Sequence, residues 1–260
     1  DTPQLTLTVG EDNHTADYTS SGSGSTTKVF KYTIQAGDND TDGISIGANA
    51  LALNSGSIRD AALNNAILSH SAMSANTSYK VDTTAPSLSQ VTAITTPTKD
   101  TTPSYAFSSN EAGTIAYGGS CSSGTTSASS GTNTISFNTL SDNSYSDCTV
   151  TVTDSAGNAS NALSVNTFVV DATAPTLNSV AISSASGVQN RLLNSGDVAS
   201  VTATFSESVV VNTASGNPTL TLVVGSTNRT ATYTSGDNST TLVFQYTIRA
   251  GDTDTNGISI

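Results

Sequence analysis

The sequence predicts an all-β protein built from tandem antiparallel sandwiches, and three observations lead to that prediction. Apolar and hydroxylated residues alternate with a period of two, as a strand with one solvated face requires. Clusters of glycine, serine, asparagine and aspartate separate these runs at short spacing, which is typical of sandwiches. Residues 3–46 recur nearly intact as residues 218–260, so the chain carries a long internal repeat.

The clearest strand signals are alternating runs rich in threonine and valine. In chain order they cover residues 5–9, 28–34, 149–153 and 201–205. The best helix candidate covers residues 57–66. Because it contains Asp60-Ala-Ala-Leu-Asn64, which is predicted to form a turn, almost no helix is expected.

Two nearly identical linkers divide the chain into domains. They read Val81-Asp-Thr-Thr-Ala-Pro86 and Val170-Asp-Ala-Thr-Ala-Pro175. Proline fixes its own φ and favours an extended residue before it, so each linker is a short, stiff lead into a first strand. The expected domains are the C-terminal part of a long Ig-like sandwich repeat, a complete Ig-like sandwich, and the N-terminal part of the next long repeat. They cover residues 1–82, 83–172 and 173–260.

The phase of the repeat supports this division. The offset between the copies is 215 residues up to the pair Tyr18 and Tyr233, and 214 from the pair Phe30 and Phe244, because one residue is lost in a Ser/Gly loop. The repeat is out of phase with the domains, so the two outer segments are parts of different copies of one long domain. Sandwiches joined in this way are expected to form an elongated array.

Composition and charge exclude several classes of function. The chain has 8 basic and 20 acidic residues and a net charge of −12. Nucleic-acid binding relies on clusters of lysine and arginine, so no nucleic-acid partner is expected. No run approaches the roughly 18 apolar residues of a membrane helix, so this segment is expected not to insert in a membrane. The acidic, hydroxyl-rich chain instead suits the cell surface or the extracellular space.

The two cysteines, Cys121 and Cys148, both fall in the middle domain. A redox or metal pair is one interpretation, but no histidine lies near them in sequence to complete a metal set. A disulfide is therefore predicted, as befits an extracellular chain. Closing a loop of this length stabilises a domain by roughly 3–4 kcal/mol in the chain-entropy model.

Four acidic patterns recur in the turns, and carboxylates are ligands that Ca²⁺ prefers. Three are single carboxylates: one in the linker, one in a turn after a strand, and one that opens an Asp-x-x-x-Asn turn. They are, in that order, Asp82 and Asp171, Glu111 and Glu207, and Asp154 and Asp60. The fourth is a D-x-D-x-[DN]-G loop, found at Asp38, Asp40 and Asp42 and again at Asp252, Asp254 and Asn256.

The topology of an Ig-type sandwich brings three of these carboxylates to one pole. The chain entry, the loop after the second strand and the loop before the last strand meet there, which places Asp82, Glu111 and Asp154 together. Three carboxylates repel one another unless a cation neutralises them, and oxygen ligands from separate loops suit Ca²⁺. The site would lie at the junction with the preceding domain, so a bound ion would stiffen the joint. Solvated acidic loops are the alternative.

The D-x-D-x-[DN]-G loops match the opening of a Ca²⁺-binding loop, but they lack the flanking helices of an EF-hand. In the first copy the twelfth position is Asn49 rather than glutamate. A calcium site and a plain acidic turn are equally compatible with this half motif. In either class of site the affinity expected is that of extracellular modules, roughly 10⁻⁴–10⁻³ M.

Several motifs together resemble a known family. The two linkers, with Phe107-Ser-Ser-Asn-Glu-Ala-Gly113 and Thr153-Asp-Ser-Ala-Gly-Asn-Ala-Ser160, resemble the bacterial Ig-like repeats of giant surface adhesins. The longer repeat is similar to those of large cyanobacterial motility and adhesin-type surface proteins. The resemblance covers essentially the whole chain.

This resemblance implies extracellular stalk modules with Ca²⁺ at their junctions. It implies that Asp82, Glu111 and Asp154 are the ligands in the middle domain. Asp171 and Glu207 match the next such site, whose third ligand would be a counterpart of Asp60. The turn after Asp60 has leucine where the family often has glycine, which is a departure from the pattern.

The function expected is that of a structural spacer in a bacterial surface or secreted adhesin, with neighbouring repeats of the same protein as its partners. One alternative is a self-assembling filament in which part-domains of neighbouring copies complete each other by strand complementation. Another is a ligand-binding adhesin domain. No enzymatic activity is expected, because His14 and His70 lie in polar stretches without a nucleophile motif and are predicted to be solvated.

Overall fold

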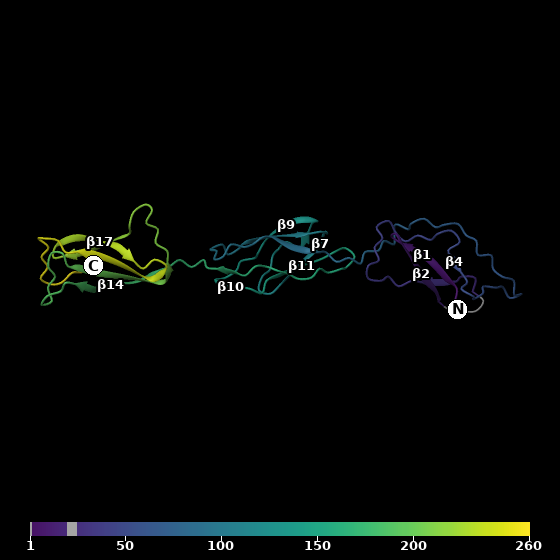
Figure 1. The fold of residues 1–260 in the computed structure, drawn as a ribbon, viewed down its shortest axis with the longest axis horizontal. Helices are drawn as coiled ribbons and strands as arrows, with labels where there is room; N and C mark the ends of the chain where they lie inside the picture. The colour runs from purple at the N-terminus through teal and green to yellow at the C-terminus, as the bar shows by residue number, and fades with distance from the viewer. Residues whose placement is uncertain (1, 20–24) are drawn as a thin grey trace. The chain divides into compact units, whose positions relative to one another are not determined.

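The computed structural model describes residues 2–19 and 25–260, and this part of the chain is all-β (Figure 1). Every pairing between its named strands is antiparallel. The prediction of an all-β fold is confirmed, and residues 57–66 form no helix. The position at which the two repeats differ by one residue falls in a stretch that includes residues 20–24, which lie outside the described residues.

The chain divides into two compact units, the first ending at Ala172 and the second beginning at Thr173. The division falls in the second linker. The first linker lies inside the first unit, where it joins a small sheet to the sandwich that begins after residue 82. The expected boundary between residues 82 and 83 is thus a joint within one compact unit.

The first sheet has the strand order β3-β2-β1-β4. Its strands are β1 (Gln4–Val9), β2 (Asp12–Thr19), β3 (Val29–Lys31) and β4 (Leu51–Ala52). β1 and β2 form a hairpin in which Val9 faces Asp12, and the two-residue turn needs a positive φ, which Gly10 supplies at +62°. Val9 and Ala16 are buried on one face of this hairpin.

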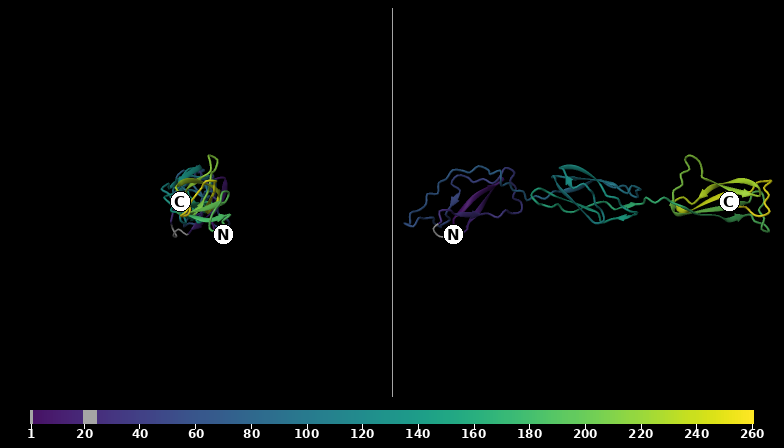
Figure 2. Two further views of the ribbon diagram at one scale, coloured as in Figure 1. Left: turned by 90° about the vertical axis from the view of Figure 1, so that its left-hand side faces the viewer. Right: turned by 180° about the vertical axis from the view of Figure 1, so that it is seen from behind.

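After β4 the chain becomes irregular for about thirty residues, although it stays attached to the first sheet. Figure 2 shows this segment, coloured blue, running along the purple strands. Isolated bridges pair Ile46 with Met73 and Asp40 with Val81. The second bridge brings the chain back beside the loop that follows β3, and the linker begins at that point.

The sandwich of residues 83–172 contains three sheets. One has β5 (Leu88–Thr92), β6 (Ser104–Ser109) and β9 (Gly131–Ser136), in that order. A second has the order β12-β11-β7-β8, with β7 (Gly113–Gly118), β8 (Ser127–Ala128), β11 (Thr149–Thr153) and β12 (Leu163–Ser164). The third pairs β10 (Asn143–Tyr145) with β13 (Phe168–Val170).

The core of this sandwich lies between the sheets. Tyr105 and Phe107 from β6, Val150 and Val152 from β11 and Phe168 from β13 are all fully buried. A disulfide between Cys121 and Cys148 borders the same core, and both cysteines are buried. This one compact core fixes the loops at the end of the sandwich that carries the acidic residues.

The second unit is built on one sheet of order β14-β15-β18-β17-β16. Its strands are β14 (Leu177–Ser186), β15 (Val198–Val209), β16 (Thr219–Val224), β17 (Thr227–Ser235) and β18 (Ser239–Thr247). Its core gathers Val201, Leu222, Ala231 and Phe244 on one face of the sheet.

The internal repeat gives the two units the same three strands in the same order. β16, β17 and β18 are the counterparts of β1, β2 and β3. The predicted strand over residues 28–34 is nevertheless only three residues long, whereas its counterpart β18 has nine. The reason is that β18 pairs with both β15 and β17, while β3 pairs with β2 alone.

Candidate metal centre

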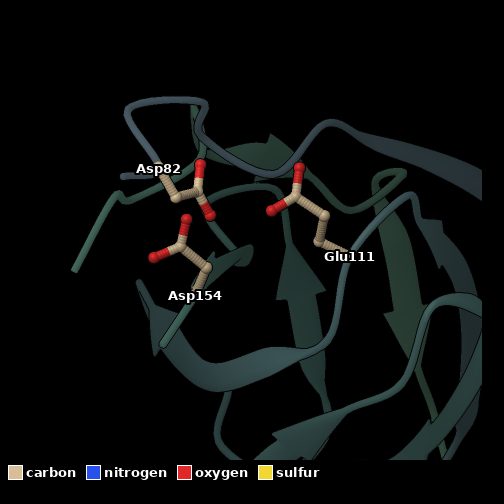
Figure 3. A group of neighbouring side chains, drawn as sticks. All are labelled: Asp82, Glu111 and Asp154. Atoms are coloured by element: carbon tan, nitrogen blue, oxygen red, sulfur yellow. The ribbon is translucent and has the colours of Figure 1, made fainter. Parts of the chain in front are cut away.

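Three carboxylates from distant segments meet at one end of the sandwich in the first unit. Asp82 lies in the linker, Glu111 in the turn after β6, and Asp154 directly after β11. Each offers one oxygen, and these oxygens all lie within 4.8 Å of one another. Figure 3 shows the three side chains turned toward one another. Asp154 is buried, Glu111 is half-buried and Asp82 is exposed.

A tight turn over residues 154–158 holds Asp154 in place. One oxygen of its carboxylate accepts hydrogen bonds from the backbone N–H groups of Ala156 and Asn158, both at 2.8 Å. The other accepts the side-chain amide of Asn158 at 2.9 Å. Burial acts to raise the pKa of Asp154, but hydrogen bonds from the Asn158 side chain and from the backbone outweigh it and lower that pKa. Asp154 is therefore held in its charged form.

Asp82 and Glu111 are fixed less tightly. The Asp82 carboxylate accepts the N–H of Thr84 at 3.0 Å, and its backbone carbonyl accepts the side-chain amide of Asn158 at 3.1 Å. The Glu111 carboxylate accepts the side-chain amide of Asn110 at 3.1 Å. Both carboxylates keep oxygen lone pairs free for a further partner.

The linker is docked onto the loop that follows β3 by a set of hydrogen bonds that the sequence reasoning missed. The Asn39 side chain accepts the N–H of Thr83 at 3.0 Å and donates to the Thr84 hydroxyl at 3.0 Å. The Thr83 hydroxyl accepts the N–H of Gly37 at 2.9 Å and donates to the carbonyl of Asp38 at 3.0 Å. Asp82 is thereby held against the loop that follows β3 as well as against the sandwich.

The surroundings of the triad are acidic and open. A cleft of about 690 Å³ beside it is lined by Asp40, Lys80, Asp82 and Glu111 among others. Within the described residues no ion pair neutralises the three carboxylates. Carboxylates this close repel one another in the absence of a counter-charge. The arrangement can therefore hold a metal ion.

The turn that begins at Asp60 has the same hydrogen bonds as the turn at Asp154, although it is exposed. The Asp60 carboxylate accepts the N–H of Asn64 at 2.7 Å and its side-chain amide at 2.8 Å. These bonds, from the side chain first and then the backbone, lower the pKa of Asp60. The leucine that departs from the family pattern does not prevent the turn, because Leu63 adopts a positive φ of 69° where Gly157 has 96°.

Replacing Leu63 by glycine is expected to stabilise the first unit by about 0.5–1 kcal/mol in urea unfolding. A left-handed conformation costs a non-glycine residue about 1–2 kcal/mol, and the extra chain entropy of glycine offsets about 0.5–1 kcal/mol of that gain. Little packing is lost because Leu63 is 71% exposed. Gly157→Ala is the matched control, with open space around the new Cβ, and should destabilise. Two shifts of the same sign would contradict this account.

The second predicted site draws on both units. Asp171 is exposed, and its N–H donates to the carbonyl of Thr98 at 2.9 Å. Glu207 is half-buried in β15, and one buried oxygen of its carboxylate has no hydrogen-bond partner among the described residues. Asp171 belongs to the first unit and Glu207 to the second, so their association stays a prediction.

The two D-x-D-x-[DN]-G loops give their first aspartates a packing role. Asp38 and Asp252 are turned inward, with side chains 7% and 2% exposed, and each accepts the hydroxyl of a tyrosine, Tyr32 or Tyr246. Asp38 also accepts the backbone N–H of Gln35 at 2.7 Å, and Asp252 accepts that of Arg249 at 2.9 Å. These carboxylates are engaged inside the fold and are not available as ligands.

The second aspartates of these loops cap their own turns. Asp40 accepts the N–H of Gly43 at 2.6 Å, and Asp254 accepts the N–H groups of Gly257 at 2.9 Å and Gly225 at 2.8 Å. The third positions, Asp42 and Asn256, are exposed. In the part of the chain that the structure describes, only Asp82, Glu111 and Asp154 form a group of three potential ligands.

The prediction that both histidines are solvated is only partly right, because each is half-buried and contacts other groups of the protein. His14 contacts Tyr32 and Asp38, and His70 accepts the N–H of Ala50 at 2.9 Å. Polar neighbours in the sequence did not imply full solvent exposure of these side chains, because strand pairing and the return of the chain partly bury both rings. A signal was present in the repeat, since Tyr32 and Asp38 recur six residues apart in the second copy.

No protein-family model matches the chain, and neither a curated protein nor a solved structure matches it. Over the described residues the search for a helix of sufficient length and apolar character to cross a membrane finds none.

Proposed function

We propose that this chain is a structural spacer of an extracellular or bacterial cell-surface protein, and that Ca²⁺ at the acidic triad stiffens one of its joints. The observation that carries the proposal is the convergence of Asp82, Glu111 and Asp154 at the joint between the first sheet and the sandwich. The resemblance of the linkers and turns to adhesin repeats points the same way, as does the disulfide between two buried cysteines.

The ligands of the triad favour Ca²⁺ over Mg²⁺. Ca²⁺ takes about 6–8 oxygen ligands at about 2.3–2.6 Å in flexible geometry, whereas Mg²⁺ demands a near-ideal octahedron at about 2.0–2.1 Å and usually keeps several waters. Three carboxylates from separate segments, with oxygens within 4.8 Å of one another, suit the more adaptable coordination of Ca²⁺. Water and nearby carbonyl groups would supply the remaining ligands.

The mechanical effect follows from where the ligands come from. Asp82 belongs to the linker, whereas Glu111 and Asp154 belong to the sandwich. A bound ion would therefore tie the linker to the sandwich, while the hydrogen bond between Thr83 and Asn39 ties it to the loop that follows β3. With the ion absent, repulsion among the carboxylates favours opening of the joint.

Adding Ca²⁺ at ten times its dissociation constant is expected to stabilise the first unit by about 1.4 kcal/mol. In a unit of this size that corresponds to a rise in Tm of about 3–5 °C, reversed by a chelator. Differential scanning calorimetry over 0.1–10 mM Ca²⁺, about the range expected of extracellular modules, measures both the shift and the affinity.

Glu111→Gln is the variant that tests the site, because the Glu111 carboxylate supports only one side-chain hydrogen bond. It should weaken the Ca²⁺ response at least about tenfold, as expected when a charged ligand is lost. Glu11→Gln, in the exposed turn between β1 and β2, is the matched control and should respond like the wild type. The site would be excluded if the wild-type Tm changed with neither Ca²⁺ nor chelator. It would also be excluded if Ca²⁺ shifted the Tm of the two variants equally.

The strand-complementation alternative receives less support from the arrangement of strands. Both part-domains contain the same three strands, β1–β3 in the first unit and β16–β18 in the second. If one unit completed the other, the two sets would compete for the same neighbours, and one set would lose its pairing. A spacer function requires no exchange of strands between copies, so this competition does not arise.

A further inference from the structure

In the first copy of the repeat, the extended segment of residues 40–46 has a neighbour on each side. On its inner side Ser45 exchanges two backbone hydrogen bonds with Thr8 of β1, at 2.9 and 3.0 Å. On its other side the segment forms antiparallel bridges with residues 73–81, and six backbone hydrogen bonds of 2.7–3.2 Å join the two. We name this second side the outer edge.

The second copy keeps the inner pairing and leaves the outer edge open. Residues 254–260 are the counterpart of residues 40–46, and Ser259 exchanges backbone hydrogen bonds with Val223 of β16 at 2.8 and 3.0 Å. Backbone groups of successive residues point to opposite sides of an extended segment, so those of Ile258 point away from β16. Among the described residues, none forms a backbone hydrogen bond with this outer edge.

The exposure of equivalent residues differs between the copies in the same sense. Gly43 is buried whereas Gly257 is exposed, and Asp40 is 3% exposed whereas Asp254 is half-buried. A Cβ on Gly43 would overlap the carbonyl of Asn76, whereas a Cβ on Gly257 would have open space around it. The outer edge of the second copy therefore has the backbone arrangement that receives a strand in the first copy, together with the room for one.

A cavity of about 280 Å³ beside this edge suits an apolar side chain of an incoming strand. Its lining includes Ile182, Leu192, Leu193, Asp254, Gly257 and Ile258. In the first copy the residue that pairs with Asp40, the counterpart of Asp254, is Val81, and Val81 is buried. An aliphatic side chain at that position of a docked strand would enter the cavity and shield Leu192, which is 64% exposed, from water.

We propose that the outer edge of residues 254–260 is a docking site for a strand. Its occupant is an extended, unpaired polypeptide segment with the chemistry of residues 73–81, which has mostly small side chains and an aliphatic residue that enters the cavity. In this mode of recognition main-chain hydrogen bonds supply the affinity and pockets for alternate side chains supply the specificity. The folded first unit of another copy is not this occupant, because its residues 73–81 are already paired with residues 40–46.

The direct test adds a synthetic peptide of residues 71–82 to the isotope-labelled full chain, with a chelator present so that Ca²⁺ plays no part. The amide NMR signal of Ile258 is expected to shift and its hydrogen exchange to slow, because its N–H gains an acceptor. The signal of Ile44 should stay unchanged, because residue 79 already accepts its N–H. Unchanged signals throughout residues 254–260 at the highest soluble peptide concentration would overturn the proposal.

Two glycines provide a matched pair of variants for the same titration. Gly257→Ala places a methyl group where the first copy has the partner's carbonyl, whereas Gly251→Ala places one where both copies have open space. Both glycines have a positive φ, of 97° and 91°, so the two substitutions carry similar backbone strain. Gly257→Ala should weaken peptide binding at least about tenfold, the scale of one lost hydrogen bond, and Gly251→Ala should bind like the wild type. Equal binding by the two variants would contradict docking at this edge.

Changes in the peptide test the same contact without altering the fold of the chain. N-methylation of Val81 removes the N–H that donates to Asp40 in the first copy, so it should abolish binding. N-methylation of Lys80, whose N–H has no backbone partner among the described residues, is the control and should leave binding intact. Equal binding of the two peptides would refute the pairing. A chain that self-associates without peptide, and thereby protects residues 254–260, would show that a second copy is the occupant and would also overturn the proposal.

Discussion

Replacing Phe168 by alanine is expected to destabilise the first unit by about 3–5 kcal/mol, the usual cost of removing a buried phenylalanine ring. Phe168 is fully buried on β13 and is the centre of an aromatic stack. Its ring lies 5.2 Å from that of Tyr145 and 6.4 Å from that of Phe137, nearly parallel to both.

Equilibrium urea unfolding measures this loss, with the slope of the transition as a check on two-state behaviour. Val169→Ala is the matched control, since Val169 is the next residue on β13 and points to the other, more exposed face. It should cost well under half as much as the Phe168 change. A Phe168→Ala loss no larger than that of the control would show that the stack is not the core of this unit.

Removing the disulfide is the second change with a large expected effect. Cys121 and Cys148 are 27 residues apart, and in the chain-entropy model a loop of this size stabilises the fold by about 3.5 kcal/mol. The double variant Cys121→Ala, Cys148→Ala should therefore unfold at markedly lower urea concentration than the wild type. Both cysteines are buried in the same core as Phe168, so the lost sulfur contacts add to the effect.

Reductant provides the control for the disulfide. The wild type should shift toward the double variant when reduced, whereas the double variant should not respond. A wild type whose unfolding is the same with and without reductant would mean that the bond contributes nothing to stability. The same pair of measurements, repeated with Ca²⁺, separates the disulfide from the acidic triad because the two lie in different parts of the sandwich.

The strands and the acidic triad could be predicted because they depend on local pattern and on simple topology. The alternating run at residues 149–153 coincides with β11, and the run at residues 201–205 lies within β15. Asp82, Glu111 and Asp154 were placed together because loops at one pole of a sandwich must meet. Residue type and order along the chain are sufficient for such inferences.

The side-chain partners in the acidic loops could not be predicted in this way. Asp38 and Asp40 fit a Ca²⁺-loop pattern in sequence, yet one closes on Tyr32 and the other caps its own turn. The direction of a carboxylate depends on which strands lie beside its loop. The hydrogen bonds of Thr83 and Asn39 at the joint have the same origin, since they link residues 44 positions apart.

The sequence by itself determined that the protein is all-β, that its two ends share a repeat, and that three carboxylates gather at one joint. These features follow from side-chain alternation, turn residues and chain order. Only the tertiary structure decided how far each strand extends and which groups the buried charges meet. Nearly the same run of residues forms three residues of strand in β3 and nine in β18. The physical reason is that a strand is stable only where a neighbour accepts its hydrogen bonds, and that neighbour comes from elsewhere in the chain.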